Sequence, residues 1–151
     1  MHDFPHYYGV VATGEAKGDV TLESPGLPTL PSASPAEFGG PGDRWSPETF
    51  LVAAVADCFV LTFRAVARAS KLSWTDLRCE AAGVLDRVDG VAQFTSFEIR
   101  AALDVPPGTS AEQARRALEK AEHNCLIARS LKAAVQLRTE IRVVQSIETP
   151  A

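Results

Sequence analysis

The sequence predicts a single α+β domain in which a long apolar helix packs against antiparallel strands. Three observations lead to this fold class: an apolar helical stretch over residues 46–70, two alternating stretches joined at Asp89-Gly90, and a second capped helix followed by a last alternating stretch. Helices and strands do not alternate regularly along the chain, so a doubly wound parallel sheet is not expected. The predicted domain covers residues 1–151, which is long enough to bury a sizeable core.

The long helix is the central element of this prediction. Ser46 can accept hydrogen bonds from its first free N–H groups, and Pro47 suits the first helical position, where no N–H is needed. Residues 50–63 contain only two polar side chains, Asp57 and Thr62, so nearly every face of the helix is apolar. Such a helix is normally enclosed by protein on most sides. One small sheet cannot cover it, so either two helices sandwich it or a second copy of the chain does. The sequence favours the second copy, in an obligate homodimer.

The residues before this helix predict short extended segments. Tyr7–Ala12 and Asp19–Glu23 have the composition of two short strands around a turn. Between Ser24 and Pro35 four prolines predict an extended connection without a helix, because proline fixes φ and lacks an N–H. The glycine-rich residues 37–45 then lead to the helix, without the Gly-Lys-Ser/Thr ending of a phosphate-binding loop.

The residues after the helix predict a hairpin, a helix and a strand. Residues 76–88 alternate, Asp89-Gly90 is a strong hairpin signal, and the return strand places one set of side chains on a common face: Thr95, Phe97, Ile99, Ala101 and Leu103. Ser110 and Gln113 form a capping box for the second helix, which carries Ala114, Leu118, Ala121 and Cys125 on one side. Alternation over Val135–Gln145 predicts the last strand.

Charge and cysteine content restrict the protein's environment. A net charge of −4 and a pI near 5.4, without a basic run, argue against a nucleic-acid surface. The N-terminus lacks the basic and then apolar pattern of a signal peptide. The apolar run at 50–63 is too short to span a bilayer and carries Asp57 at its middle, so no membrane contact is expected. Three cysteines in a chain of this kind predict a cytoplasmic protein, where disulfides are more often catalytic than structural.

Cys58 and Cys125 are the candidate reactive residues. A cysteine in an apolar helix is often only a small buried hydrophobic residue, and Cys79 fits that interpretation well because it alternates with apolar neighbours on a strand. Cys125 differs, because it follows His123-Asn124, where the second helix breaks. A helix end can leave a thiol partly exposed and reactive.

Other site chemistries have less support. His123-x-Cys125 is only a pair of metal ligands, and His2 and His6 lie far away in the N-terminal segment, whereas a tetrahedral zinc site usually needs four ligands. A Cys-His hydrolase would need a base near Cys58, and only His123 is available. We therefore expect neither a metal nor another cofactor.

Two groups of motifs resemble the OsmC/Ohr family, which comprises osmotically inducible and organic-hydroperoxide-resistance proteins. The first group is Phe38-Gly39-Gly40-Pro41-Gly42, Ser46-Pro47-Glu48 and Cys58-Phe59. The second is Cys125-Leu126-Ile127 with Ser130-Leu131-Lys132. Order and spacing match over nearly the whole chain. The combination is specific, although neither group would be specific by itself.

The resemblance implies a cysteine-based peroxidase that acts on organic hydroperoxides. Cys58 would attack the peroxide and become a sulfenic acid, and Cys125 would condense with it to a disulfide that a dithiol reduces. Glu48 would position an arginine. The family's dimer intertwines two chains, which would also cover the apolar helix.

The chain departs from this pattern at the residue that should activate the thiolate. Burial in an apolar helix disfavours a thiolate, so a nearby cation is required. The Ohr branch has an arginine in the N-terminal hairpin turn, where this chain has Gly14-Glu15-Ala16-Lys17-Gly18. Lys17 and Arg44 are the candidate cations, although a lysine does not replace a bidentate arginine. Asp57 stands where the family usually has a small residue. These departures leave one alternative open: a protein of this fold that binds a small hydrophobic ligand without turnover.

Overall fold

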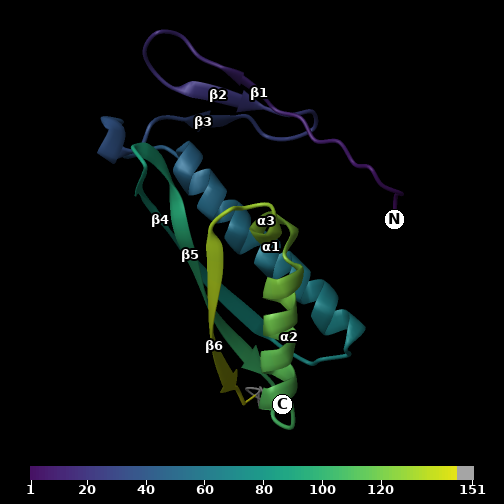
Figure 1. The fold of residues 1–151 in the computed structure, drawn as a ribbon. Helices are drawn as coiled ribbons and strands as arrows, with labels where there is room; N and C mark the ends of the chain where they lie inside the picture. The colour runs from purple at the N-terminus through teal and green to yellow at the C-terminus, as the bar shows by residue number, and fades with distance from the viewer. Residues whose placement is uncertain (146–151) are drawn as a thin grey trace, which may run out of the picture. The chain divides into compact units, whose positions relative to one another are not determined.

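A computed structural model describes residues 1–145 (Figure 1). The chain divides into two compact units, Met1–Leu51 and Val52–Ala151, and each is described by itself. This division leaves the single domain over residues 1–151 a prediction, and residues 146–151 lie outside the described part.

The N-terminal unit contains a three-stranded antiparallel sheet in the order β1-β2-β3. Its strands are β1 (Val11–Thr13), β2 (Val20–Glu23) and β3 (Leu30–Ser32). The first strand is shorter than the predicted Tyr7–Ala12, because only residues 11–13 find partners on β2. The third strand lies inside the proline-rich connection, where no strand was expected. Pro31 is tolerated there because β3 is an edge strand and proline lacks a ladder N–H.

The residues after β3 lead into helix α1 (Pro47–Ala69) through the short 3₁₀ helix η1 (Ala36–Phe38). Gly40 is pressed against the main chain there: a Cβ at this position would lie 1.6 Å from the carbonyl oxygen of Ser34. No side chain fits in that space. The glycine of the sequence motif is therefore required by packing.

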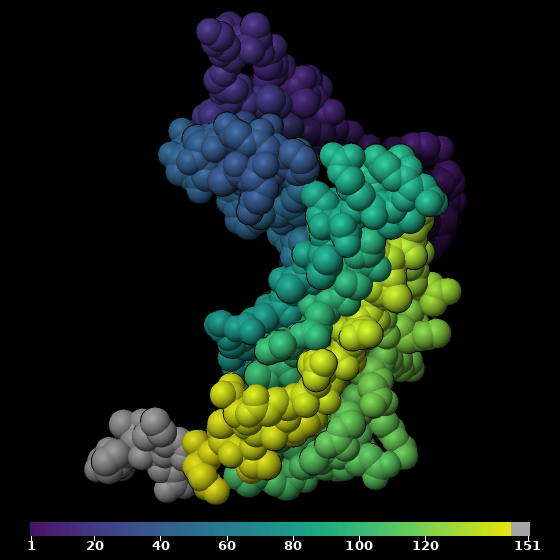
Figure 2. All heavy atoms as spheres, turned by 60° about the vertical axis from the view of Figure 1, so that its left-hand side comes forward, coloured from purple at the N-terminus to yellow at the C-terminus, as the bar shows by residue number. Residues whose placement is uncertain are grey.

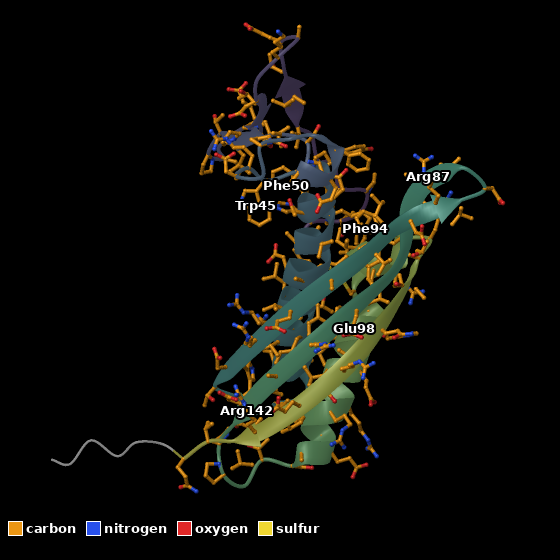
Figure 3. The ribbon with its side chains drawn as sticks, turned by 90° about the vertical axis from the view of Figure 1, so that its left-hand side faces the viewer. Trp45, Phe50, Arg87, Phe94, Glu98 and Arg142 are labelled. Atoms are coloured by element: carbon orange, nitrogen blue, oxygen red, sulfur yellow. The ribbon has the colours of Figure 1, made fainter. Side chains whose placement is uncertain are left out.

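The start of α1 is capped as the sequence predicts. The amide of Thr49 donates to Ser46 Oγ at 3.2 Å, and the amide of Ser46 donates to Thr49 Oγ1 at 2.8 Å. The two residues form a reciprocal cap in which Thr49 takes the place usually held by Glu or Gln. The rings of Trp45 and Phe50 stack with centroids 5.6 Å apart (Figure 3).

In the C-terminal unit, α1 buries one narrow stripe of side chains at four-residue spacing: Val55, Phe59, Phe63 and Ala67. Within residues 1–145, α1 is the one helix long and apolar enough to cross a membrane. The apolar run over residues 50–63 is by itself too short to cross a membrane, but the helix that contains it continues to Ala69. Core helices of soluble proteins pass the same test, and the buried stripe of α1 packs inside the protein.

The C-terminal unit also contains a sheet in the order β4-β5-β6, formed by β4 (Asp76–Val88), β5 (Val91–Val105) and β6 (Ala134–Val143). Strand β6 runs alongside the hairpin (Figure 2). The hairpin β4–β5 is antiparallel and β5–β6 is parallel. Helices α2 (Ala111–Asn124) and α3 (Leu126–Arg129) separate β5 from β6, and such a crossover returns the chain in the same direction. The α+β fold class is confirmed, with one mixed sheet where only antiparallel pairing was expected.

The face of this sheet that carries most of the core is called the inner face: Phe97, Ile99, Ala101, Leu103 and Val105 are all buried on β5. The predicted inward residue Thr95 is exposed, because a bulge leaves it without a partner opposite Val84 and Leu85. Phe94 instead stacks on Phe97, with ring centroids 5.0 Å apart.

Helix α2 lies against β6 (Figure 1) and buries the side that the sequence indicated, with Ala117 in addition. The amide of Gln113 donates to Ser110 Oγ at 3.2 Å, which confirms the predicted N-cap. The buried residues are Ala114, Ala117, Leu118 and Ala121. Their spacing brings the last turn of α2, and then Cys125, onto the core side.

Candidate active site

Cys58 lies in the middle of α1 and is partly buried. Its sulfur lies 3.8 Å from the hydroxyl oxygen of Thr62, one helical turn further along. Residues four apart share a helix face, so this contact follows from their spacing. Asp57, the residue before Cys58, is exposed.

Cys125 lies where α2 ends and α3 begins. Its backbone is extended, with φ −64° and ψ 107°, so it closes one helix and opens the next. The residue is fully buried, at 0% exposure. The sequence predicted a partly exposed thiol at this helix end, and that expectation is wrong. The chain turns inward at the break, because the core side of α2 continues through Cys125.

The thiols of Cys58 and Cys125 are brought together. Burial, the largest cause, raises the pKa of the Cys125 thiol to about 11, and a hydrogen bond to Cys58 and the charge of Cys58 act in the same direction. The backbone N–H groups of Ala128 and Ile127 counteract this change and lower the pKa. Cys125 therefore favours its protonated, neutral form beside Cys58.

Cys79 is a third thiol in the same region. It lies on β4 opposite Ala101, a residue of the inner face. Burial raises the pKa of the Cys79 thiol to about 11, and the charges of Cys125 and Glu80 act in the same direction. Cys79 is half-buried, as the sequence predicted for a strand cysteine on an apolar face. Its closeness to Cys125 has no signal in the sequence, because the two residues lie on elements far apart in the chain.

Glu48 lies in the first turn of α1, in the N-terminal unit. Its Oε2 atom is buried and has no hydrogen-bond partner within residues 1–145. A buried carboxylate oxygen without a donor is costly, and such atoms are normally paired. Glu48 can therefore accept a hydrogen bond from a donor that residues 1–145 of the single chain do not supply.

The two candidate cations also belong to the N-terminal unit. Arg44 donates to Asp19 at 2.8 Å and lies 3.5 Å from Asp43. These carboxylates raise the pKa of Arg44, with the hydrogen bond to Asp19 as the largest cause. Lys17 is exposed in the turn between β1 and β2. The role of Arg44 or Lys17 as the cation beside Cys58 stays a prediction.

His123 and the possible metal ligands were the residues considered for other chemistries. In the described part of the chain, no three His, Cys, Asp or Glu side chains are placed to hold a metal ion. The side chain of His123 is exposed, whereas Cys125 is buried. Sequence reasoning missed Thr62 as a neighbour of Cys58, although the four-residue spacing was a usable signal.

Comparisons with known proteins agree on one family. The model of the family described as OsmC-like protein matches residues 40–140, which include both cysteine motifs. The uncharacterised protein YmaD of Bacillus subtilis is 30% identical over 142 residues, covering 91% of this chain and 94% of that protein.

Solved structures show the same fold. An OsmC-like protein of unknown function from Vibrio cholerae superposes with a TM-score of 0.81 at 20% identity, covering 89% of this chain and 99% of that one. An organic hydroperoxide resistance protein OsmC from Legionella pneumophila superposes with a TM-score of 0.71 at 24% identity, covering 93% of this chain and 100% of that one. Since the family model matches more than half of the sequence, the chain belongs to the OsmC-like protein family.

Proposed function

We propose that this protein is a thiol-dependent peroxidase that reduces organic hydroperoxides in the cytoplasm. The observation that carries the proposal is the closeness of the partly buried Cys58 and the fully buried Cys125, seen in the effect of Cys58 on the Cys125 pKa. Two thiols so close can form a disulfide after one of them is oxidised. The OsmC-like relative from Legionella is an organic hydroperoxide resistance protein, which supports the substrate class.

The positions of the two thiols favour one order of events. Cys58 is the more accessible, so its thiolate attacks the terminal peroxide oxygen. The O–O bond breaks, the alcohol leaves with a proton, and Cys58 becomes a sulfenic acid. Cys125 then attacks the Cys58 sulfur, an S–S bond forms, and hydroxide leaves as water with the Cys125 proton. A dithiol returns two electrons and restores both thiols.

Oxidation of Cys58 also prepares Cys125 for its step. The charge of Cys58 helps to raise the Cys125 pKa, and this charge is lost when the Cys58 thiolate becomes a neutral sulfenic acid. The N–H groups of Ala128 and Ile127, which lower that pKa, remain. Burial, the largest cause of the raised pKa, also remains, so the oxidation of Cys58 favours the Cys125 thiolate only in part.

A cation must still hold the Cys58 thiolate and polarise the peroxide. Glu48 has a buried oxygen without a donor, which supports its role of holding an arginine. On a straight helix Glu48 lies about 15 Å from Cys58 at ~1.5 Å per residue, so a bridging side chain is needed. Arg44 remains our first choice and Lys17 our second. Arg44 would have to break its ion pair with Asp19 and bind Glu48 instead.

A second copy of the chain would complete the protein. In the N-terminal unit the fully buried residues are Ser32 and Ser46, and Leu22, Phe50 and Leu51 are half-buried. Many of its large apolar side chains are exposed: Tyr7, Tyr8, Val11, Leu27, Leu30, Phe38 and Trp45. A unit without a buried apolar residue does not hold together by itself. We therefore propose an obligate homodimer that buries far more than the ~1,600 Å² of a standard interface.

The pairing of Arg44 with Asp19 favours a second candidate. If no cation reaches Cys58, the chain would keep the fold and bind a small hydrophobic ligand without turnover. Retention of both cysteines favours the enzyme.

One experiment separates the two functions. The protein is treated with one equivalent of cumene hydroperoxide, and peroxide loss and disulfides are measured by mass spectrometry. We expect a Cys58–Cys125 disulfide, turnover with a dithiol, and no turnover in Cys58→Ser. The matched control is Cys79→Ser, which should keep its activity. A parent protein that consumes no peroxide with a dithiol would leave the ligand-binding function in its place.

The dimer is tested by dilution. An obligate dimer loses its folded structure as the concentration falls, because no stable monomer exists. Sedimentation and circular dichroism over a dilution series would measure this. A folded monomer at nanomolar concentration would contradict the homodimer.

A further inference from the structure

Thr62 makes an unusual contact for a hydroxyl inside a helix. Its Oγ1 lies 3.8 Å from Cys58 Sγ, and within residues 1–145 this sulfur is its hydrogen-bond partner. Ser and Thr hydroxyls in helices commonly bond back to a main-chain carbonyl four residues earlier. Ser70 and Ser130 do so here, each at 2.8 Å, to Val66 and Leu126. The Thr62 hydroxyl is directed at a side chain that the proposed reaction uses.

Within residues 50–63 of α1, no polar side chain other than Thr62 is placed to donate to Cys58. Thr62 and Asp57 are the polar side chains of residues 50–63, and Asp57 is exposed. A β-branched residue has few rotamers in a helix, so the hydroxyl of Thr62 is held near Cys58. The proton of this hydroxyl is free to point at the sulfur.

We propose that Thr62 is a positioning residue that donates a hydrogen bond to the Cys58 thiolate. The inference rests on the proposed function for its use in turnover, but the contact itself belongs to the thiol. A distance of 3.8 Å is long for a neutral thiol, and contacts of catalytic groups often tighten when charge develops. A thiolate is a charged acceptor, and hydrogen bonds to charged groups are shorter and stronger.

Thr62 and Cys125 approach the Cys58 sulfur from different elements, α1 and the α2–α3 junction. The thiol of Cys125 is consumed when the disulfide forms, whereas the hydroxyl of Thr62 is not. When a dithiol reduces the disulfide, an S–S bond to the dithiol forms as the Cys58–Cys125 bond breaks, and the second thiol of the reductant then closes the reductant's own disulfide. Both cysteines are restored, and the Cys58 thiolate again accepts the hydrogen bond of Thr62.

The test compares Thr62→Val, which removes the hydroxyl but keeps the branched shape, with Thr62→Ser, which keeps the hydroxyl. The primary measurement is the rate of Cys58 alkylation by iodoacetamide as a function of pH, followed on the Cys58 peptide. The titratable neighbours are Asp57 on the same helix, Cys125 at the helix junction, and Cys79 beside Cys125. All three are unchanged in both variants.

In Thr62→Val we expect the pH midpoint of alkylation to rise by about one unit and peroxide reduction to slow by about tenfold. Thr62→Ser should have an alkylation midpoint and a rate of peroxide reduction close to those of the parent protein. The matched control is Ser70→Ala, whose hydroxyl is bonded to a carbonyl and should move neither measurement.

The outcomes separate this inference from the proposed function. An unchanged midpoint in Thr62→Val would overturn the role of Thr62 whatever the peroxidase activity. A raised midpoint in a protein that reduces no peroxide would support Thr62 as the donor to the thiolate, while the peroxidase function itself would fail. A shift in Thr62→Val that Thr62→Ser does not restore would indicate a packing effect and overturn the inference.

Discussion

The inner and outer faces of the sheet β4-β5-β6 belong to the same strands but differ in their side chains: the inner face is apolar and the outer face is charged. The inner face carries fully buried apolar side chains and the half-buried Cys79. On the outer face, Glu98 accepts from Arg100 at 2.6 Å and from Arg138 at 3.0 Å, and Arg142 donates to Asp104 at 2.7 Å (Figure 3). The inner face is apolar and buried, whereas the outer face carries exposed ion pairs.

The pKa directions follow this difference. On the outer face, hydrogen bonds from Arg100 and then Arg138 hold the pKa of Glu98 below its ordinary value, so the charged form is favoured. On the inner side, burial raises the pKa of Cys79 and Cys125, so the neutral form is favoured. The outer-face arginines Arg100 and Arg138 bind Glu98, so they are held on the face of the sheet opposite the buried side chains.

The largest effect on stability is expected from the inner face. Leu103→Ala removes a fully buried side chain from β5 and should lower the free energy of unfolding by about 2–5 kcal/mol. Urea unfolding followed by circular dichroism measures the loss. The control on the same strand is Val91→Ala, at 62% exposure, which should change stability little. Equal losses at the two sites would remove the distinction between buried and exposed positions.

The next effect is a loss of stability at high pH. Thiols with an ordinary pKa near 9.0 have values of about 11 in the folded protein. A raised folded-state pKa means that the folded state binds more protons between pH 9 and 11, so its stability is complete below pH 9 and falls as pH rises toward 11. The maximum loss is roughly 2–3 kcal/mol per thiol, since one pKa unit corresponds to about 1.4 kcal/mol.

Urea unfolding of the reduced protein at several pH values measures this dependence. Cys79→Ala should make the alkaline loss smaller, because one of the two raised thiols is removed. A free energy of unfolding that stays constant from pH 8.5 to 11 would contradict the buried, neutral state of the inner thiols.

A smaller effect is expected where the inner face is most crowded. Gly83 lies opposite Phe97, and a Cβ there would lie 2.8 Å from a ring carbon of Phe94 and 3.0 Å from one of Phe97. Gly83→Ala should therefore cost about 1–3 kcal/mol through displaced rings. The control is Gly9→Ala, where nothing lies within 4 Å of the added carbon. Thermal unfolding compares the two, and an increased melting temperature in Gly83→Ala would show that the rings move aside freely.

The smallest effect is expected on the outer face. Glu98→Gln removes the acceptor shared by Arg100 and Arg138, but both arginines are exposed and surface ion pairs contribute little. Because the pKa of Glu98 is lowered, its contribution is present above the ordinary value and disappears as pH falls through the folded-state value. The difference between parent and variant should shrink at low pH and in high salt. A loss as large as that of Leu103→Ala would make the two faces energetically equal.

The sequence by itself determined the elements that depend on neighbouring residues. The cap at Ser46, the apolar stretch of α1 and the Asp89-Gly90 turn are local signals, and the structure has α1 over Pro47–Ala69 and β4 over Asp76–Val88, as predicted. Capping and periodicity act within one or two turns or strands, so they can be read from contiguous residues. The spacing of the motifs around Cys58 and Cys125 also led to the family.

Only the tertiary structure decided the features that depend on partners distant in the chain. The bulge that exposes Thr95 and turns Phe94 inward arises from pairing with β4. The parallel direction of β6 is set by the crossover through α2 and α3. The closeness of Cys79 to Cys125 depends on how β4 and the end of α2 are placed in the folded chain. Pairing and burial are properties of the assembled core. No single segment contains the information that sets them, because each side chain's environment is supplied by other segments.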